Sequence, residues 1–147
     1  MCYLRLCIKE LHMKTFFSTK VVGGDFIALI LRIASGVPML LFHGWKKLAG
    51  FAEKAADFAD PLGVGSSVSL GLTVFAEVLC ALCIIFGFLS RLAAIPYVIT
   101  MFVATFMIHA GDPFEDRELA MVYLLLGLGV LIAGSGKYSL DKAFLNK

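Results

Sequence analysis

The carboxyl group with the clearest chemical potential is that of Glu77, which stands inside the apolar run 75–91. An ionised carboxylate left unpaired in apolar surroundings costs several kcal/mol, so such an acid is expected to face other helices and to find a partner. Two arginines, Arg32 and Arg91, also border or interrupt apolar runs. Glu77, Arg32 and Arg91 therefore form a candidate intramembrane polar site.

A second set of reactive side chains lies near the ends of apolar runs: His43, His109, Glu118 and Lys47. Two histidines at one depth could ligate a b-type haem or a metal. Hydrogen-bonded to Glu118, they could instead bind a polar substrate head or carry a proton. We expect this polar cluster and no tightly bound haem or metal, because both rings lie where the chain leaves its apolar run.

Cys80 and Cys83 form a C-x-x-C pair in the middle of an apolar run. A redox-active pair of this kind needs a helix N-terminus to lower the thiol pKa, and this pair has none. The absence of a histidine after Cys83 excludes a covalent c-type haem signature. We therefore interpret both cysteines as small buried apolar residues.

The composition decides which elements carry these residues. Of the 147 residues 60% are hydrophobic and 16% charged, with a mean hydropathy of +0.90, whereas a soluble domain has about 45–50% apolar and about 25% charged residues. The net charge of +2 is too small to indicate a nucleic-acid partner. Segments of roughly 20 apolar residues mark membrane spans. The sequence predicts an all-α integral membrane four-helix bundle with spans at 26–42, 67–89, 92–110 and 119–133.

The basic residues between the spans predict the topology. Eight Lys and Arg lie on the side of the termini and four on the other side. The positive-inside rule then makes both termini cytoplasmic, with residues 1–24 as a cytoplasmic tail in a multi-pass protein of the inner (plasma) membrane. Either Met1 or Met13 could be the start. Between the first two spans, residues 51–62 have the apolar spacing of a short amphipathic helix on the outer interface, with a lid over the helix ends as the alternative.

The depths of the charged residues suggest their partners. At 1.5 Å per residue, Glu77 lies roughly 15 Å below the outer surface and Arg32 roughly 10 Å above the inner one, in a core of about 30 Å. An arginine side chain spans the remaining gap, so Glu77–Arg32 is the expected pair. A protonated Glu77 and an Arg32 that reaches the headgroups are the alternatives. Asp141 is a candidate partner for Arg91.

The assembled pattern resembles the DoxX family of small four-helix membrane proteins, over about residues 25–145. The chain departs mildly from the family pattern at Ser90, where threonine is usual before the arginine. The motifs that carry the resemblance are, in order, Arg32 with Gly36, His43-Gly44, Lys47-Leu48, Glu77, the run 87–94, His109, Glu118-Leu119-Ala120 and the run 134–141.

The resemblance implies a role beside redox enzymes, as an integral subunit of a quinone-linked oxidoreductase such as thiosulfate dehydrogenase (quinone), or as a partner or assembly factor of one. We expect a non-catalytic subunit that holds a quinone-like molecule or a small sulfur substrate near Glu77 and the outer His/Glu cluster. It would contact membrane lipid and other redox membrane or peripheral proteins. Self-association stays open. The alternatives are a small proton-coupled transporter that uses Glu77, and a structural factor for another membrane protein.

Overall fold

Helices are the regular elements of the computed structural model, which describes residues 23–144. The all-helical prediction is confirmed for these residues. The predicted tail 1–24 lies outside them, except for its last two residues.

The first long helix is longer than the sequence suggests. α2 (Gly24–Pro38), the π-helical turn η1 (Met39–Gly44) and α3 (Trp45–Ala49) follow one another without a break. Pro38 has no N–H to donate, and the wider turn begins directly after it. Because the helix continues past the predicted end at residue 42, the lysines of α3 are held on a helix rather than in a loop.

The segment after the first helix is mostly irregular. α4 covers only Phe51–Lys54, and turns and bends lead from there to Gly65. The prediction of an amphipathic helix over 51–62 is therefore wrong beyond its first turn. Pro61 and three nearby glycines favour turns over a continued helix in this stretch.

The next two long helices each contain a π-helical turn. α5 (Ser66–Val74), η2 (Phe75–Cys80) and α6 (Ala81–Phe86) form one helix, and α7 (Ser90–Val103) with η3 (Ala104–Ile108) forms the next. Together with Gly24–Ala49, the helices Ser66–Phe86 and Ser90–Ile108 are long and apolar enough to cross a membrane.

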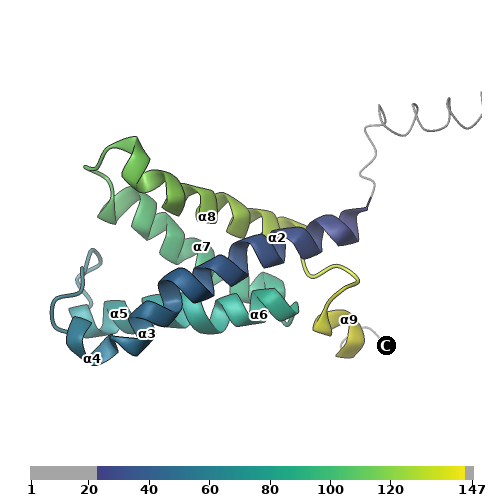
Figure 1. The fold of residues 1–147 in the computed structure, drawn as a ribbon, viewed down its shortest axis with the longest axis horizontal. Coiled ribbons are helices and arrows are strands. Elements are labelled where there is room, and N and C mark those ends of the chain that lie inside the picture. The colour runs from purple at the N-terminus through teal and green to yellow at the C-terminus, as the bar shows by residue number, and fades with distance from the viewer. Residues whose placement is uncertain (1–22, 145–147) are drawn as a thin grey trace, which may run out of the picture.

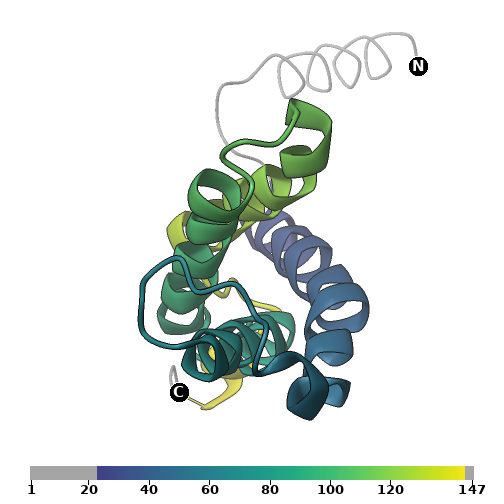
Figure 2. The ribbon, with the colours of Figure 1, turned by 90° about the vertical axis from the view of Figure 1, so that its left-hand side faces the viewer.

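α8 (Phe114–Ala133) has 20 residues and packs on α7 and α2. Because its first turn is charged, it is not among the three helices that are long and apolar enough to cross a membrane. The short α9 (Leu140–Phe144) follows. In Figure 1 the start of α2 and α9 lie at the same end of the molecule, which we call the terminal end. At the opposite end, called the loop end, the start of α8 stands apart from α3 and α4, as Figure 2 also shows.

Large apolar side chains cover much of the outside of these helices. Leu92, Leu125 and Ile132 are 62%, 62% and 77% exposed. A soluble protein rarely shows so much contiguous apolar surface, whereas lipid tails cover such surface in a membrane. The core lies where α2, α6, α7 and α8 meet, around Tyr97, Ile84 and Val130.

Candidate functional site

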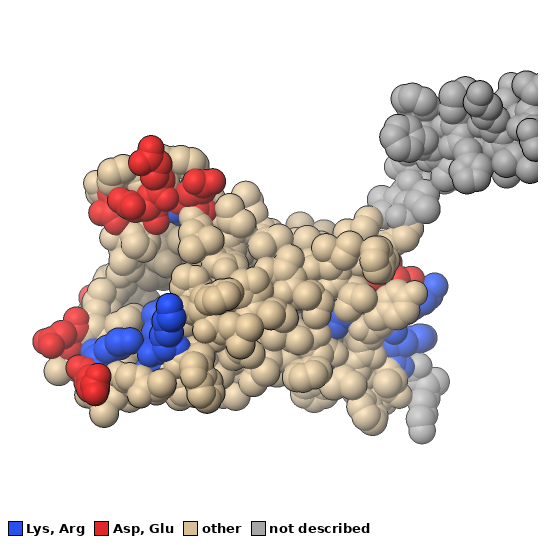
Figure 3. Space-filling model, viewed as in Figure 1, with Lys and Arg blue, Asp and Glu red and all other residues tan. Residues whose placement is uncertain are grey.

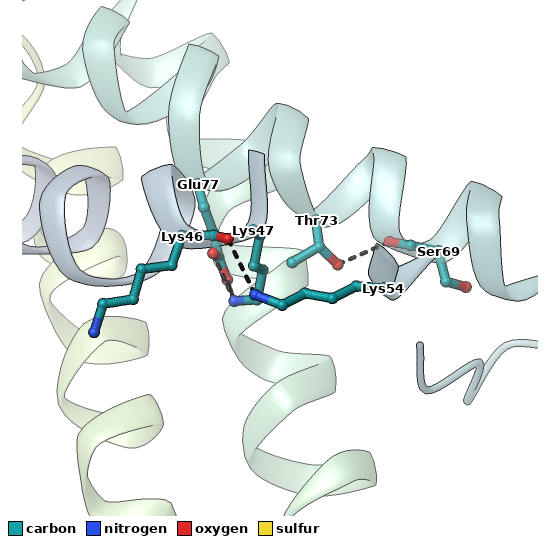
Figure 4. Close-up of polar contacts among 6 residues, drawn as sticks. All are labelled: Lys46, Lys47, Lys54, Ser69, Thr73 and Glu77. Atoms are coloured by element: carbon teal, nitrogen blue, oxygen red, sulfur yellow. Dashed lines mark hydrogen bonds and ion pairs between the residues drawn. The ribbon is translucent and has the colours of Figure 1, made fainter. Parts of the chain in front are cut away.

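Glu77 is buried and forms an ion pair with Lys47. The Lys47 Nζ atom lies 2.6 Å from Oε1 and 2.7 Å from Oε2 of Glu77, whose side chain is 4% exposed against 25% for that of Lys47. Figure 4 shows the two side chains pointing toward each other, with Lys46 directed elsewhere. The predicted Glu77–Arg32 pair is wrong, because Lys47 occupies both carboxylate oxygens.

The partner is set by a close approach of two helix backbones. A Cβ atom on Gly44 would lie 2.6 Å from the carbonyl oxygen of Glu77, so only glycine allows η1 to lie this close to η2. Lys47 follows Gly44 by three residues, about one turn, on the helix that continues into α3. Its side chain therefore reaches the carboxylate from the next turn.

The ion pair lies at an apolar cavity of about 290 Å³ near the loop end. Lys47 and Glu77 line it with Ser69 and Thr73 of α5, and Phe58 lines it from the loop. Figure 3 shows that the surface is hollowed at this end, between the acidic start of α8 and the basic side chains over α3. The other lining residues are Ala59, Pro61, Leu62, Leu72, Ile99, Thr100, Val103, Ala104, Ile108 and His109.

All three π-helical turns of the described residues surround this ion pair or its cavity. Gly44 ends η1, Glu77 lies in η2, and Ala104 and Ile108 of η3 line the cavity. Single π-helical turns within α-helices occur frequently at functional sites, because the extra residue redirects side chains. Their position supports a functional rather than a purely packing role for the ion pair.

The loop that lines the cavity is stabilised by hydrogen bonds to Asp60. Its Oδ1 atom accepts hydrogen bonds from the Ser69 hydroxyl at 2.7 Å and the Val64 N–H at 3.0 Å, and Oδ2 accepts one from the Gly65 N–H at 2.6 Å. The hydroxyl donor and these N–H groups lower the pKa of Asp60, and slight burial opposes them. Four residues of this loop, Phe58, Ala59, Pro61 and Leu62, line the cavity.

The predicted outer cluster comes together only in part. His109 and Lys47 line the same cavity. The His109 Nδ1 atom lies 2.7 Å from Oδ2 of Asp112, and the His43 ring meets the edge of Tyr123 at 5.5 Å between centroids. Glu118 is exposed. No hydrogen bond within residues 23–144 joins His43, His109 and Glu118 to one another, and the two histidines have separate partners.

Arg32 binds backbone groups near the terminal end of the molecule and is not the partner of Glu77. Its side chain is fully buried and donates hydrogen bonds to the carbonyl oxygens of Ile85, at 3.3 Å, and Tyr138. These bonds connect α2 to α6 and to the segment after α8. The sequence left open whether Arg32 turns inward to an acid or reaches the headgroups. In the structure Arg32 turns inward, and its partners are backbone carbonyl groups in place of an acid.

Arg91 and Asp141 also have partners other than each other. Arg91 Nη2 donates to the carbonyl oxygen of Ile132 at 3.2 Å. Asp141 accepts the Leu89 N–H at 2.7 Å, the Ser90 N–H at 3.4 Å and the Ser135 hydroxyl. The candidate Arg91–Asp141 pair is wrong, because the carboxylate caps the start of α7.

Within residues 23–144, no group of three or more His, Cys, Asp or Glu side chains lies close enough to hold a metal ion. Cys80 is buried and Cys83 half-buried, and both are free thiols. The ion pair and its cavity are thus the candidate site. The sequence signal for the Lys47–Glu77 pair was the three-residue spacing between Gly44 and Lys47. This spacing is informative only once the first helix is known to continue past residue 42.

Comparisons with known proteins support the resemblance stated above. The DoxX family model matches residues 27–110. An uncharacterized protein of Haemophilus influenzae (strain ATCC 51907 / DSM 11121 / KW20 / Rd) is 28% identical over 127 residues, which cover 74% of this chain and 84% of that relative. No solved structure matches the chain. With a family match over more than half its length and three helices that can cross a membrane, the chain belongs to the DoxX family of small membrane proteins.

Proposed function

We propose that this chain is a membrane subunit that binds a quinone headgroup for a quinone-linked oxidoreductase. The observation that carries the proposal is the apolar cavity whose wall includes the Lys47–Glu77 ion pair. Ligand sites are mostly apolar pockets with a few polar groups that orient the ligand. A quinone is a flat apolar ring with two carbonyl oxygens that accept hydrogen bonds, so its chemistry matches this lining.

The donors of the site fit a carbonyl ligand. A lysine ammonium has three N–H donors, and the two Glu77 oxygens account for two of those of Lys47. The third is available for a ligand oxygen. His109 lines the cavity as a group that can exchange a proton. Leu72, Ile99 and Val103 contribute apolar wall for the ring.

The interior beside Glu77 favours binding over transport. A proton-coupled carrier needs a polar route from Glu77 to the terminal end. On the same helix, the next turns toward that end bring Cys80, Ala81 and Ile84 into the core, 4%, 0% and 0% exposed. Tyr97 of α7 belongs to the same core. This tight packing leaves the transporter as the second hypothesis.

The proposal includes a placement in the membrane. α8 would be the fourth span, with Glu115, Asp116 and Glu118 in the headgroup region at its positive N-terminal end. The bundle would lie in the inner (plasma) membrane with both termini in the cytoplasm and the Lys47–Glu77 cavity toward the outer side. A catalytic redox protein would then be the partner on that side or in the membrane.

The test is binding of a short-chain quinone to the full-length protein in mild detergent. We expect saturable binding, weakened about tenfold to a hundredfold by Lys47→Met, because loss of a charge-assisted hydrogen bond costs about 1.5–3 kcal/mol. Leu72→Trp should block the cavity. Leu125→Trp, on the lipid-facing side of α8, is the matched control and should bind normally. Absence of saturable binding by the unchanged protein would refute the proposal.

A pull-down in the same detergent tests the partner. We expect a redox enzyme to copurify with the unchanged protein, and the isolated chain to be colourless, without a Soret band. A Soret band lost on His43→Ala or His109→Ala would overturn this view and indicate a cytochrome. Copurification of a membrane protein without redox function, combined with no quinone binding, would support the assembly-factor hypothesis.

A further inference from the structure

A second and larger cavity, of about 640 Å³, lies at the terminal end of the molecule. It is an open cavity that is lined by the start of α7, the C-terminal end of α8 and residues of the segment 134–142. The proposed quinone function does not use it. In the proposed membrane placement, in which α7 begins and α8 ends here, the cavity would lie where the bilayer passes from hydrocarbon to headgroups.

Carboxylates and cations both line this cavity, and the cations outnumber the carboxylates by three to two. Asp25 pairs with Lys137 at 3.1 Å, and Asp141 accepts the backbone and hydroxyl donors described above. Arg91 and Lys142 also line the cavity. No ion pair with a carboxylate is recorded for either of them within residues 23–144. The lining of the cavity therefore has a net positive charge.

The guanidinium of Arg91 is held in a defined position. Its Nη2 donates to the carbonyl oxygen of Ile132, at the end of α8, at 3.2 Å. A Cβ atom on Gly134, whose φ is +78°, would lie 3.0 Å from the Arg91 Nε atom. Glycine thus leaves room for the guanidinium beside the chain. The remaining N–H donors of Arg91 are available to a ligand.

Ser90 gives an independent indication of a ligand. It is fully buried and lines the cavity, yet its Oγ atom has no hydrogen-bond partner among residues 23–144. A buried hydroxyl without a partner costs about 1–3 kcal/mol, so buried polar atoms are nearly always paired. A ligand with acceptor oxygens would supply the missing partner next to the Arg91 cation.

We propose that this cavity binds the phosphate headgroup of an anionic glycerophospholipid. Arg91, with its planar fork of donors, would contact the phosphate, the Ser90 hydroxyl would donate to an oxygen, and Lys142 would add charge at the rim. Leu92 and Ile132, both largely exposed beside the cavity, provide apolar surface for the acyl chains. Basic pockets between membrane helices bind lipid headgroups in this manner. A free phosphate ion would have no use for that apolar surface.

Native mass spectrometry of the full-length protein tests the proposal, with phosphatidylglycerol and phosphatidylcholine of equal chain length added in detergent. We expect phosphatidylglycerol to be retained preferentially. Arg91→Gln should weaken its retention about tenfold to a hundredfold, as expected for a lost charge-assisted hydrogen bond. Ser90→Ala should weaken it about threefold, the usual effect of a neutral one. Binding of phosphatidylcholine should not change.

Lys46→Gln is the matched control, because it removes one positive charge at the loop end. Equal losses in Lys46→Gln and Arg91→Gln would show a general charge effect and refute the site. Displacement of phosphatidylglycerol by millimolar inorganic phosphate would also refute it, in favour of a soluble anion. Circular dichroism checks that each variant is folded. If Arg91→Gln misfolds, Arg91→Lys takes its place: it keeps the charge but not the planar fork of donors, and it should bind phosphatidylglycerol with intermediate strength.

Discussion

Breaking the Lys47–Glu77 ion pair from either side should have unequal effects on stability. Lys47→Met leaves Glu77 unpaired, with a side chain only 4% exposed. Removing one partner of a buried ion pair costs about 3–5 kcal/mol. Lys47 is 25% exposed, so solvent reaches the ion pair and weakens it. We therefore expect Lys47→Met to lower the free energy of unfolding by about 2–4 kcal/mol. Glu77→Gln leaves a lysine that can turn toward water, and we expect about 1–2 kcal/mol.

The double variant Lys47→Met/Glu77→Gln separates the pairing from the other effects of each change. It leaves no unpaired charge, so its loss should be about 2 kcal/mol smaller than the sum of the single losses. The free energies of unfolding are measured in mild detergent by titration with a denaturing detergent, with helicity followed by circular dichroism. Lys46→Met is the control and should change stability little. Additive single losses would refute the pairing and direct attention back to Arg32.

Three further predictions concern other parts of the chain. Arg32→Met should remove both hydrogen bonds to the carbonyl groups that Arg32 binds, at about 1–3 kcal/mol each, and should speed tryptic cleavage of the segment after α8; unchanged cleavage would contradict the role of Arg32. The lowered pKa of Asp60 means that its contribution to stability is present above its unfolded pKa of about 4 and is lost as the pH falls through the lower folded value. The stability difference between the unchanged protein and Asp60→Asn, followed from pH 6 to pH 3, should therefore shrink below about pH 4, and a constant difference would count against this. Ala56→Cys in intact cells should react with an impermeant thiol reagent while Cys2 does not, and the reverse labelling would invert the proposed topology.

The membrane class and the helices followed from local properties of the sequence. Apolar runs of about 20 residues form helices in a bilayer whatever surrounds them, because every backbone polar group must be satisfied within the segment. The three helices found to be long and apolar enough to cross the membrane each overlap a predicted span. The need for a partner for Glu77 was likewise predictable, since burial of a carboxylate depends on its own chemistry and on the apolar run around it.

The identity of the partner was decided by tertiary structure. Depth along the helices gave Arg32 as the nearest cation, but depth says nothing about which helix faces are in contact. The contact between Gly44 and the backbone of Glu77 and the continuation of the first helix into α3 placed Lys47 within reach. Neither can be derived from apolar periodicity, because a π-helical turn shifts the face of every residue that follows it.

The terminal end shows the same division. The sequence by itself determined that Arg32, Arg91 and Asp141 are charged residues near the ends of apolar helices. Only the folded chain determined that backbone groups, rather than opposite charges, satisfy much of their hydrogen bonding. Helix ends expose unpaired N–H and C=O groups, and which charged side chain reaches them depends on how the helices pack. The charge of these side chains and their position in apolar helices thus follow from the local sequence. The identity of their partners depends on the three-dimensional arrangement of the helices.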